Sequence, residues 1–415
     1  MQKNSDKILY RGIVLILAVI FSMLAFSACT ADTAGKSYFI EFELSDDVYV
    51  DGERLSGSEV ETLRKKISEQ LREIENQVSV EKSDSDIYAL NIADENSAVA
   101  VGAHTYSMLM LCKQLYEETG GAFSPSLFSL SELWGFSPDR EGHYSDPREE
   151  PSEESIEEIL AFSDFSSVHV QEDNTVIKED SRTKLDLGGI AKGYMSDAVA
   201  SLIQSLYPGQ DVECAISVMS NTVLLGGKHE STGAVRGYNV GIENPRKLTA
   251  NVSDGLYIVG AADVAISTSA DNYRFYVNDG NIYSHIIDPS TGRPSNNGVI
   301  SITVLVPASV MHAGALADAY STAGFCMPLT QALALYEELW EEKGIGAVVI
   351  TSDFRYYVAG DYNVLNRKEY AQLTAPQLAD TTENIFTYAQ ISLAEDTVKE
   401  SEAEREYIQR VTELA

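Results

Sequence analysis

Apolar residues along this chain recur at helical and at strand spacings. Apolar positions three or four residues apart predict helices over residues 57–77, 104–118, 191–206, 315–325 and 329–342. Short or alternating apolar runs predict strands at residues 37–44, 183–187, 213–218, 222–225, 238–242, 255–259, 262–267 and 298–306, with hairpins at 168–177 and 347–358. Because strands and helices mix without strict alternation, we expect an α+β fold with mixed, largely antiparallel sheets and packed helices.

Three stretches interrupt this pattern. Residues 79–91 are polar and rich in turn formers. Residues 139–158 are acidic and contain two prolines, so we interpret them as a solvated loop inserted into the domain. Residues 363–415 are polar and acidic with scattered apolar positions, and we interpret them as an appended acidic tail, either helical or disordered.

The N-terminus has the layout of a secretory signal. Basic residues precede an apolar run over residues 12–25 that is short for a membrane span, and small residues lead to Cys29. This ending resembles a bacterial lipoprotein cleavage box, although Phe26 stands where leucine is usual. We therefore expect a signal peptide at residues 1–28 and a lipidated tether at 29–36, anchoring the protein to the extracytoplasmic face of the cell membrane. A plain cleaved signal with a chance cysteine is the alternative.

Composition narrows the classes of function. The chain has 415 residues, of which 44% are hydrophobic, enough for a large core in one or two domains. Its formal net charge of −33 argues against nucleic acid as a partner, because binding phosphates requires a basic surface. The cysteines after Cys29 are widely spaced and lie among apolar residues, so we expect buried thiols without disulfides; they are Cys112, Cys214 and Cys326.

The turn between Asp186 and Lys192 is the first candidate site. Gly188 and Gly189 lie between a predicted strand and a predicted helix, where glycine lets the backbone approach a ligand closely. The free N–H groups of a first helical turn attract anions, and Lys192 adds a positive charge. A tight structural turn beside a solvated lysine explains the same residues equally well.

Two further stretches carry candidate chemistry. Asp318 and Thr322 are four residues apart on a predicted helix and therefore share one face. Carboxylate and hydroxyl oxygens are hard ligands that suit Mg²⁺, although a threonine bonding back to a helix carbonyl is the simpler alternative. His285 follows a strand-like run and precedes a turn, which makes it a candidate general base or, alternatively, a structural histidine.

Together these stretches resemble the ApbE family of FAD:protein FMN transferases. The matching sequences, in the family's order, are Leu-Asp-Leu-Gly-Gly-Ile-Ala-Lys-Gly-Tyr (185–194), Ser-His-Ile-Ile-Asp-Pro-Ser-Thr-Gly (284–292) and Ala-Asp-Ala-Tyr-Ser-Thr-Ala (317–323). Supporting segments also fit, and the resemblance covers about residues 37–360. It implies an ApbE/T-fold-like flavin transferase domain over residues 37–362.

The resemblance also implies an activity. Such proteins cleave the diphosphate of FAD in a Mg²⁺-dependent reaction, join FMN to a threonine or serine hydroxyl of an acceptor protein and release AMP. Members are often exported lipoproteins, and their acceptors include subunits of membrane redox complexes. By analogy, Asp318, Thr322 and the Gly189 carbonyl would bind Mg²⁺, and His285 would take the proton of the acceptor hydroxyl. The residues expected to contact FAD are Ala122, Phe123, Ser124, Asp186, Lys192 and Ile287.

Some positions depart from the family's pattern. Met219-Ser220-Asn221 replaces a Gly-Gly-acid or Gly-Gly-amide turn, and Ala270 stands where glycine is usual. Ser124 replaces an aspartate, and Glu81 falls where a tyrosine often meets the flavin. A side chain in place of glycine can crowd a ligand or forbid a positive φ. Two alternatives therefore stay open: an FAD pyrophosphatase that yields FMN and AMP, and a catalytically silent FAD-binding lipoprotein.

Overall fold

The computed structural model describes residues 41–136, 149–230, 233–246 and 256–366, with isolated positions at 369, 405, 408 and 409. All of them belong to one unit, residues 40–415. The expected signal peptide, Cys29 and the tether lie outside the described residues, as does most of the tail. Within the described ranges, no helix combines the length and the apolar character needed to cross a membrane.

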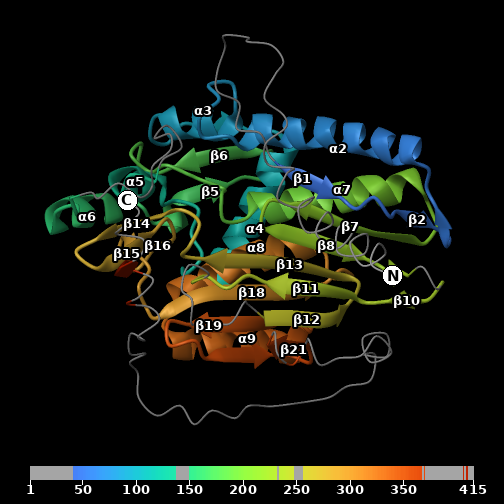
Figure 1. The fold of residues 1–415 in the computed structure, drawn as a ribbon. Coiled ribbons are helices and arrows are strands. Elements are labelled where there is room, and N and C mark those ends of the chain that lie inside the picture. Colours follow the sequence, from blue (N-terminus) through green and yellow to red (C-terminus); the bar gives the residue numbers. More distant parts are fainter. Residues whose placement is uncertain are drawn as a thin grey trace, which may run out of the picture. The chain divides into compact units, whose positions relative to one another are not determined.

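A large antiparallel sheet organises the unit (Figure 1). Among the described residues it has nine strands, in the spatial order β20 (Tyr356–Ala359), β19 (Gly346–Thr351), β18 (Val299–Pro307), β13 (Val264–Ala270), β8 (Asn221–Leu225), β7 (Val212–Val218), β2 (Tyr49–Val50) and β3 (Glu53–Arg54), while β1 (Phe42–Leu44) also pairs with β7. Every pairing in it is antiparallel. The expected α+β class with antiparallel pairing is confirmed.

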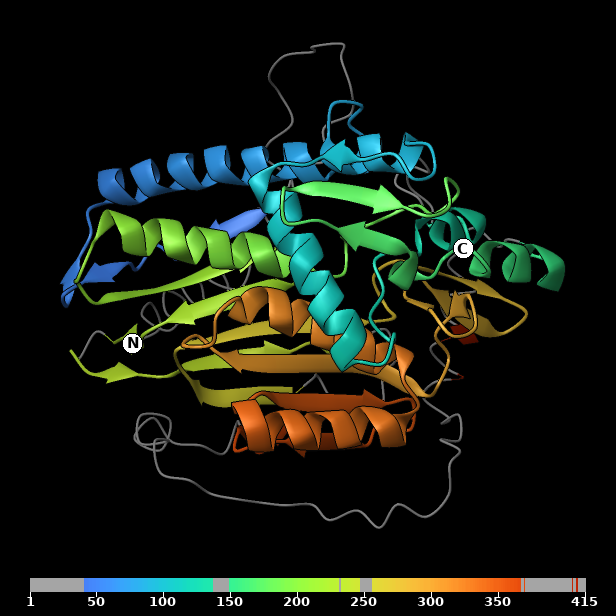
Figure 2. The same cartoon turned by 180° about the vertical axis from the view of Figure 1, so that it is seen from behind.

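Helices cover one face of this sheet, as the reverse view in Figure 2 also shows. The helices that contact it directly are α7 (Ala191–Leu206), α8 (Ala313–Cys326) and α9 (Leu329–Lys343). An outer layer packs on α7 and consists of α2 (Gly57–Val78), with α3 (Asp86–Ile92) and α4 (Ala103–Glu118) against α2. The amphipathic pattern predicted for residues 57–77 places the buried stripe of α2 toward this core.

The opposite face is covered by a small sheet. Its strands are β11 (Tyr238–Ile242), β12 (Leu256–Ala261) and β21 (Asn363–Asn366). Alternate residues of β18 face the two sides, with Ile302 in the helix-side core and Leu305 in the core beneath the small sheet. Burial on both faces explains why β18 reads as an almost continuous apolar run.

A third apolar cluster lies beside the sheet and is built from short elements. They are α5 (Phe128–Leu133), α6 (Glu153–Leu160), the hairpin β14 (Phe275–Asn278) to β15 (Asn281–Ser284), and the pair β16 (Ile287–Asp288) and β17 (Arg293–Pro294). Trp134 and Phe136 form its centre. Ile408, one of the isolated positions near the C-terminus, packs against Val277 of β14, as does Ile282 of β15.

The remaining described elements are short. They are β4 (Val99–Ala100), β5 (Val168–Val170), β6 (Thr175–Lys178), the 3₁₀ turn η1 (Phe165–Ser167), β9 (Lys228–His229) and β10 (Val235–Arg236). The predicted hairpin at 168–177 is confirmed as β5 and β6. The three cysteines in the described ranges are buried free thiols, as expected.

Two expectations about these elements were wrong. Residues 183–187 form no strand, because their backbone bonds to other groups: Leu185 N–H to Asn91 Oδ1 at 2.7 Å and Asp186 N–H to the Pro125 carbonyl at 2.8 Å. The polar stretch at 79–91, for which no element was predicted, ends in helix α3, which Ser85 caps by accepting from the N–H of Tyr88.

The described part of the expected acidic loop at 139–158 is also different. Residues 153–158 belong to helix α6, which Ser152 caps. Ile156 is 1% exposed because it packs in the third cluster, with Ile159 and Leu160 partly buried against the same cluster. The apolar residues whose spacing identifies this helix lie on both sides of residue 158, the end of the acidic stretch. The acidic composition of residues 139–158 therefore did not predict the helix.

Candidate functional site

The candidate site lies where α7 and α8 cross. Gly193 and Gly314 let the two backbones touch, since a Cβ on Gly193 would lie 2.0 Å from the Gly314 carbonyl oxygen. Asp197 of α7 caps α8, because its carboxylate accepts from the N–H groups of Gly314 at 2.7 Å and Ala315 at 2.9 Å. Burial raises the pKa of Asp197 to about 6, against those two hydrogen bonds, which lower it.

Asp318, on α8, is a buried carboxylate held by three donors. Its Oδ2 accepts from the Gly193 N–H at 3.1 Å. Its Oδ1 lies 3.2 Å from the hydroxyl of Ser267 and 3.2 Å from Nζ of Lys192. A buried charge is tolerated when it is paired and hydrogen-bonded, and Asp318, at 2% exposure, meets that condition with groups from α7 and β13.

Thr322 is the one residue of α8 that is not buried, in a helix that the structure describes throughout. Its hydroxyl donates to the Asp318 carbonyl at 3.0 Å, so the back-bonding considered as the simpler alternative is present. The hydroxyl oxygen keeps its lone pairs in that arrangement. A Cβ on Gly189 would lie 3.5 Å from Thr322 Oγ1, so the glycine turn and the Asp318–Thr322 face are adjacent.

Lys192 ties the glycine turn to α8. Its Nζ donates to the Gly188 carbonyl at 2.5 Å as well as facing Asp318. The Gly188 N–H in turn donates to Asp186 Oδ1 at 2.8 Å, so Asp186 orders the turn. The expectation of open N–H groups in the first turn of α7 was wrong for Gly193, whose N–H bonds to Asp318.

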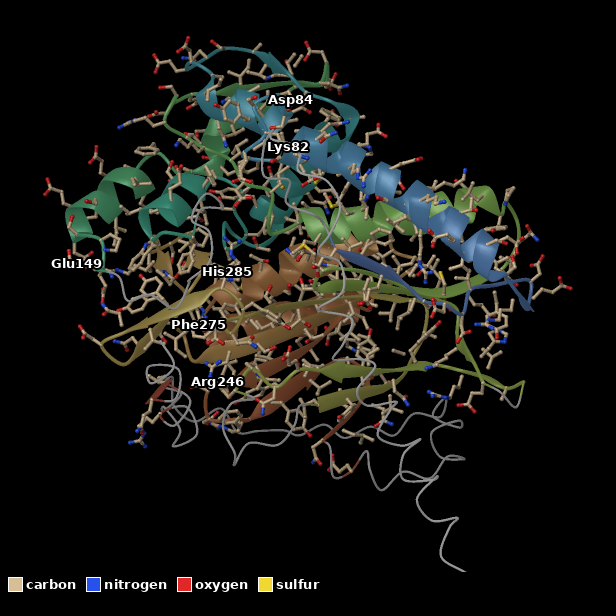
Figure 3. The ribbon with its side chains drawn as sticks, turned by 45° about the horizontal axis from the view of Figure 1, so that its top comes forward. Lys82, Asp84, Glu149, Arg246, Phe275 and His285 are labelled. Atoms are coloured by element: carbon tan, nitrogen blue, oxygen red, sulfur yellow. The ribbon has the colours of Figure 1, made fainter. Side chains whose placement is uncertain are left out.

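His285 directly follows β15 and is partly buried (Figure 3). The Arg274 carbonyl lies 3.2 Å from its Nδ1, and because a carbonyl only accepts, Nδ1 carries the proton and Nε2 the lone pair. Burial, together with the charges of Arg274 and Lys192, lowers the pKa of His285 to about 3. The imidazole is therefore neutral and electrostatically coupled to Lys192.

The residues expected to contact the flavin lie in two places. Phe123 is buried beside the glycine turn, since a Cβ on Gly189 would lie 3.3 Å from its ring, and Ala122 packs partly buried on the same core. The Ser124 hydroxyl is paired with that of Ser126 at 2.9 Å. Ile287 lies in the third cluster with Trp134, and its carbonyl accepts from the Cys326 thiol at the end of α8.

Sequence reasoning missed several polar residues on and near β13. Ser267 and Ser269 stand two apart on β13 and point to α8, where Ser269 lies 2.8 Å from the Ser321 hydroxyl. Arg246 is fully buried after β11 and makes a bidentate ion pair with Asp271, at 2.6 and 2.7 Å, just beyond β13 (Figure 3). Hydroxyls alternating on an otherwise apolar strand were the available signal for the two serines.

The altered glycine positions differ in their effect on the backbone. Met219 lies in the turn between β7 and β8 at φ 53°, the region that favours glycine, and its side chain is exposed. Ala270 instead ends β13, paired with Ser301, in extended backbone that any residue adopts. The substitution at 270 therefore needs no special conformation, whereas the one at 219 holds methionine in a disfavoured one.

Comparison with known proteins places this geometry in a family. The ApbE family profile matches residues 38–349. A relative from Treponema pallidum, named FAD:protein FMN transferase, is 30% identical over 309 residues, 72% of this chain and 79% of the relative. One of the same name from Vibrio cholerae is 32% identical over 266 residues, 63% of this chain and 74% of the relative.

Solved structures agree with the sequence relatives. The flavin transferase ApbE from Vibrio cholerae superposes with a TM-score of 0.60 at 29% identity, covering 72% of this chain and 88% of that protein. The ApbE protein from Thermotoga maritima gives a TM-score of 0.60 at 30% identity over the same shares. With the family profile spanning most of the chain, this protein belongs to the ApbE family.

Proposed function

We propose that this protein transfers FMN from FAD to a threonine or serine hydroxyl of an acceptor protein, with Mg²⁺, and releases AMP. The observation that carries the proposal is the convergence of Gly189, Lys192, Asp318 and Thr322 at the crossing of α7 and α8. This convergence joins a partly exposed hydroxyl, a buried carboxylate and a cation, the groups that a divalent ion and a diphosphate require.

The donor set around Asp318 fits Mg²⁺. The Asp318 carboxylate is held in place by donors, Thr322 carries a partly exposed hydroxyl on the same helix face, and the Gly189 backbone lies against it. All three groups offer hard oxygens, and Mg²⁺ usually completes its coordination with phosphate oxygens and water. Bound there, Mg²⁺ would supply positive charge for the diphosphate as its bond to the leaving AMP breaks.

The other side chains of the site have separate roles in binding phosphate, accepting the proton and contacting the flavin. Lys192, from its position between the Gly188 carbonyl and Asp318, neutralises phosphate charge. His285 accepts the acceptor hydroxyl's proton at Nε2, because its Nδ1 is occupied by the Arg274 carbonyl. Phe123, Ala122 and Ser124, with Asp186 and Ile287, line the flavin side.

The proposal extends to where the protein works. Residues 1–28 direct export, Cys29 carries the lipid, and residues 29–36 tether the domain at the extracytoplasmic face of the cell membrane. Acceptors there are proteins of the membrane, with redox subunits as the first candidates. The residues that support this part are the basic, apolar and small residues leading to Cys29.

The test is incubation of the purified protein with FAD and Mg²⁺, with and without an acceptor peptide containing threonine. Mass spectrometry measures the covalent FMN adduct, and chromatography measures AMP. We expect an adduct and AMP in equal amounts, both dependent on the acceptor. Equal AMP with and without acceptor identifies a pyrophosphatase instead, and bound FAD without any AMP identifies a silent binding protein.

A further inference from the structure

We propose that Asn221 and Ser267 form a hydrogen-bond relay that positions the carboxylate of Asp318 for Mg²⁺. The inference rests on the proposed function of Asp318 as a metal ligand. It assigns a role to two positions outside the three sequence stretches described above. Asn221 also stands in the turn where this chain departs from the family's glycines.

The relay crosses three elements. Asn221 begins β8 and is the cross-strand partner of Ser267 on β13. Its Nδ2 lies 3.0 Å from the Ser267 hydroxyl, and that hydroxyl lies 3.2 Å from Asp318 Oδ1 on α8. All three side chains are buried, and Asn221 and Ser267 are both 0% exposed. Hydrogen bonds between buried groups are electrostatically stronger than bonds in water, so their geometry is more strongly determined than at the surface.

The direction of the hydrogen bonds follows from chemistry. An ionised carboxylate only accepts, so Ser267 gives its single hydroxyl proton to Asp318. The serine oxygen then has only lone pairs to offer, and Asn221 must turn its NH₂ group toward it. This orientation leaves Asn221 Oδ1 buried with no hydrogen-bond partner among the described residues. A buried carbonyl oxygen without a partner costs stability. That Asn221 is present in spite of this cost indicates that its NH₂ group is needed as a donor to Ser267.

The relay matters because it fixes one oxygen of the carboxylate. Gly193 N–H holds Oδ2, while Lys192 and Ser267 share Oδ1. Lys192 also bonds to the Gly188 carbonyl and its side chain is 26% exposed, so it is the less constrained of the two. Without Asn221, the Ser267 hydroxyl loses the partner that aims its proton at Asp318. Groups behind metal ligands tune affinity in this way.

The test measures Mg²⁺ binding to the purified protein by isothermal titration calorimetry, without FAD or acceptor. We expect Ser267→Ala and Asn221→Leu each to weaken Mg²⁺ binding by about tenfold or more, as is typical of groups behind metal ligands. The double variant should bind no more weakly than Ser267→Ala alone, because both changes break the same chain. Asn221→Ala serves as a second variant if leucine prevents folding.

Ser301→Ala is the matched control. Ser301 is a buried serine on β18, next to β13, and its hydroxyl has no partner among the described residues. We expect this variant to bind Mg²⁺ like wild type. Urea unfolding of all variants separates stability from binding.

Two results would overturn the relay. One is unchanged Mg²⁺ affinity in variants that have lost only stability, which identifies a structural pair. The other is an additive loss in the double variant, which means that Asn221 and Ser267 act separately. The outcome is independent of FMN transfer: a wild type that binds Mg²⁺ and modifies no acceptor refutes the proposed function while the relay can still hold.

Discussion

Asp318 illustrates how individual residues of this site depend on their neighbours. Its carboxylate is almost completely buried, yet it is matched by a backbone donor, a hydroxyl and an ammonium. The Asp318 carboxylate therefore has two roles: it holds α8 against α7, and it places its oxygens on the same helix face as Thr322. Removing it therefore affects both packing and chemistry.

Asp318→Asn keeps the shape of the side chain and removes its charge. We expect FMN transfer to fall by about 100-fold or more, because the proposed Mg²⁺ site loses its anionic ligand and an amide nitrogen must face one of the donors. The decisive measurement is the Mg²⁺ dependence of the initial rate. Transfer at the wild-type rate with unchanged Mg²⁺ dependence would refute the metal assignment.

The lowered pKa of His285 predicts how stability and the transfer rate depend on pH. Its pKa of about 3, against an ordinary value of 6.5, means that the unfolded chain binds a proton between these values that the folded chain does not. Stability from this group is thus lost as pH falls through that window. The imidazole stays neutral from about pH 5 to 8, so transfer by wild type should show no acid limb near 6.5 from this residue.

His285→Gln tests the same side chain by substitution. We expect the transfer rate to fall by about 10²–10⁴-fold, the usual contribution of a general base, with FAD binding retained. Fluorescence titration with FAD provides the control. Loss of FAD binding with an unchanged rate at saturating FAD would make His285 a ligand contact.

At the scale of elements, the crossing of α7 and α8 sets the site's geometry. Lys192 and Gly193 are neighbours on one helix, and Gly314 and Asp318 lie one turn apart on the other. The distance from Lys192 to Asp318 is therefore fixed by how closely the two glycines allow the backbones to approach.

Gly193→Ala tests this contact. Alanine ordinarily favours a helix, but here its Cβ would lie 2.0 Å from the Gly314 carbonyl oxygen, so we expect destabilisation of about 1–3 kcal/mol. Gly57→Ala is the control, because Gly57 opens α2 and a Cβ there would meet no described atom within 4 Å. Urea unfolding should show a loss for the first variant only; equal stability would contradict the close contact.

The α8 cap titrates in the opposite direction to His285. The pKa of Asp197 is raised from 3.8 to about 6, so the folded chain binds more protons between these values, and stability from this group falls as pH rises through them. The free energy of unfolding should therefore change with pH by about 3 kcal/mol at most because of Asp197, and Asp197→Asn should remove this change. Unfolding free energies measured at several pH values test this: parallel profiles for variant and wild type would contradict it.

Element by element, the sequence predicted what local spacing determines. Residues 191–206 form α7 as predicted, and the predicted bounds of α2 are within one residue. The strand predicted at residues 183–187 was wrong because the hydrogen-bond partners of this segment, Asn91 and Pro125, are distant in sequence. The β14–β15 hairpin was missed although Asp279-Gly280, both at positive φ, is a strong hairpin turn.

The site residues likewise include some that local sequence predicts and others that it does not. The three motifs identify Gly189, Asp318 and His285 because each lies in a recognisable local sequence. Asn221 and Ser267 have no such context, since their pairing depends on the register of β8 against β13. A single polar residue in an apolar strand does not reveal which strand or helix it meets.

At the scale of the whole molecule, the proposed lipid anchor at Cys29 would restrict the acceptors to those within reach of the membrane. Cys29→Ala should release the protein from the membrane fraction, because the proposed lipid is attached at the Cys29 sulfur. Fractionation of cells followed by immunoblotting measures this, with wild type as the control. A variant that stays in the membrane fraction would mean that another part of the chain holds it there.

The position of Ile408 has a practical consequence. It packs on Val277 of the β14–β15 hairpin, and His285 is the residue that follows that hairpin, so Ile408 lies against the support of the candidate base. A peptide fused after Ala415 would begin only a few residues beyond this contact. Tethering raises effective concentration without any new affinity. The C-terminus is therefore a natural place to offer an acceptor threonine in cis and to screen acceptor sequences one fusion at a time.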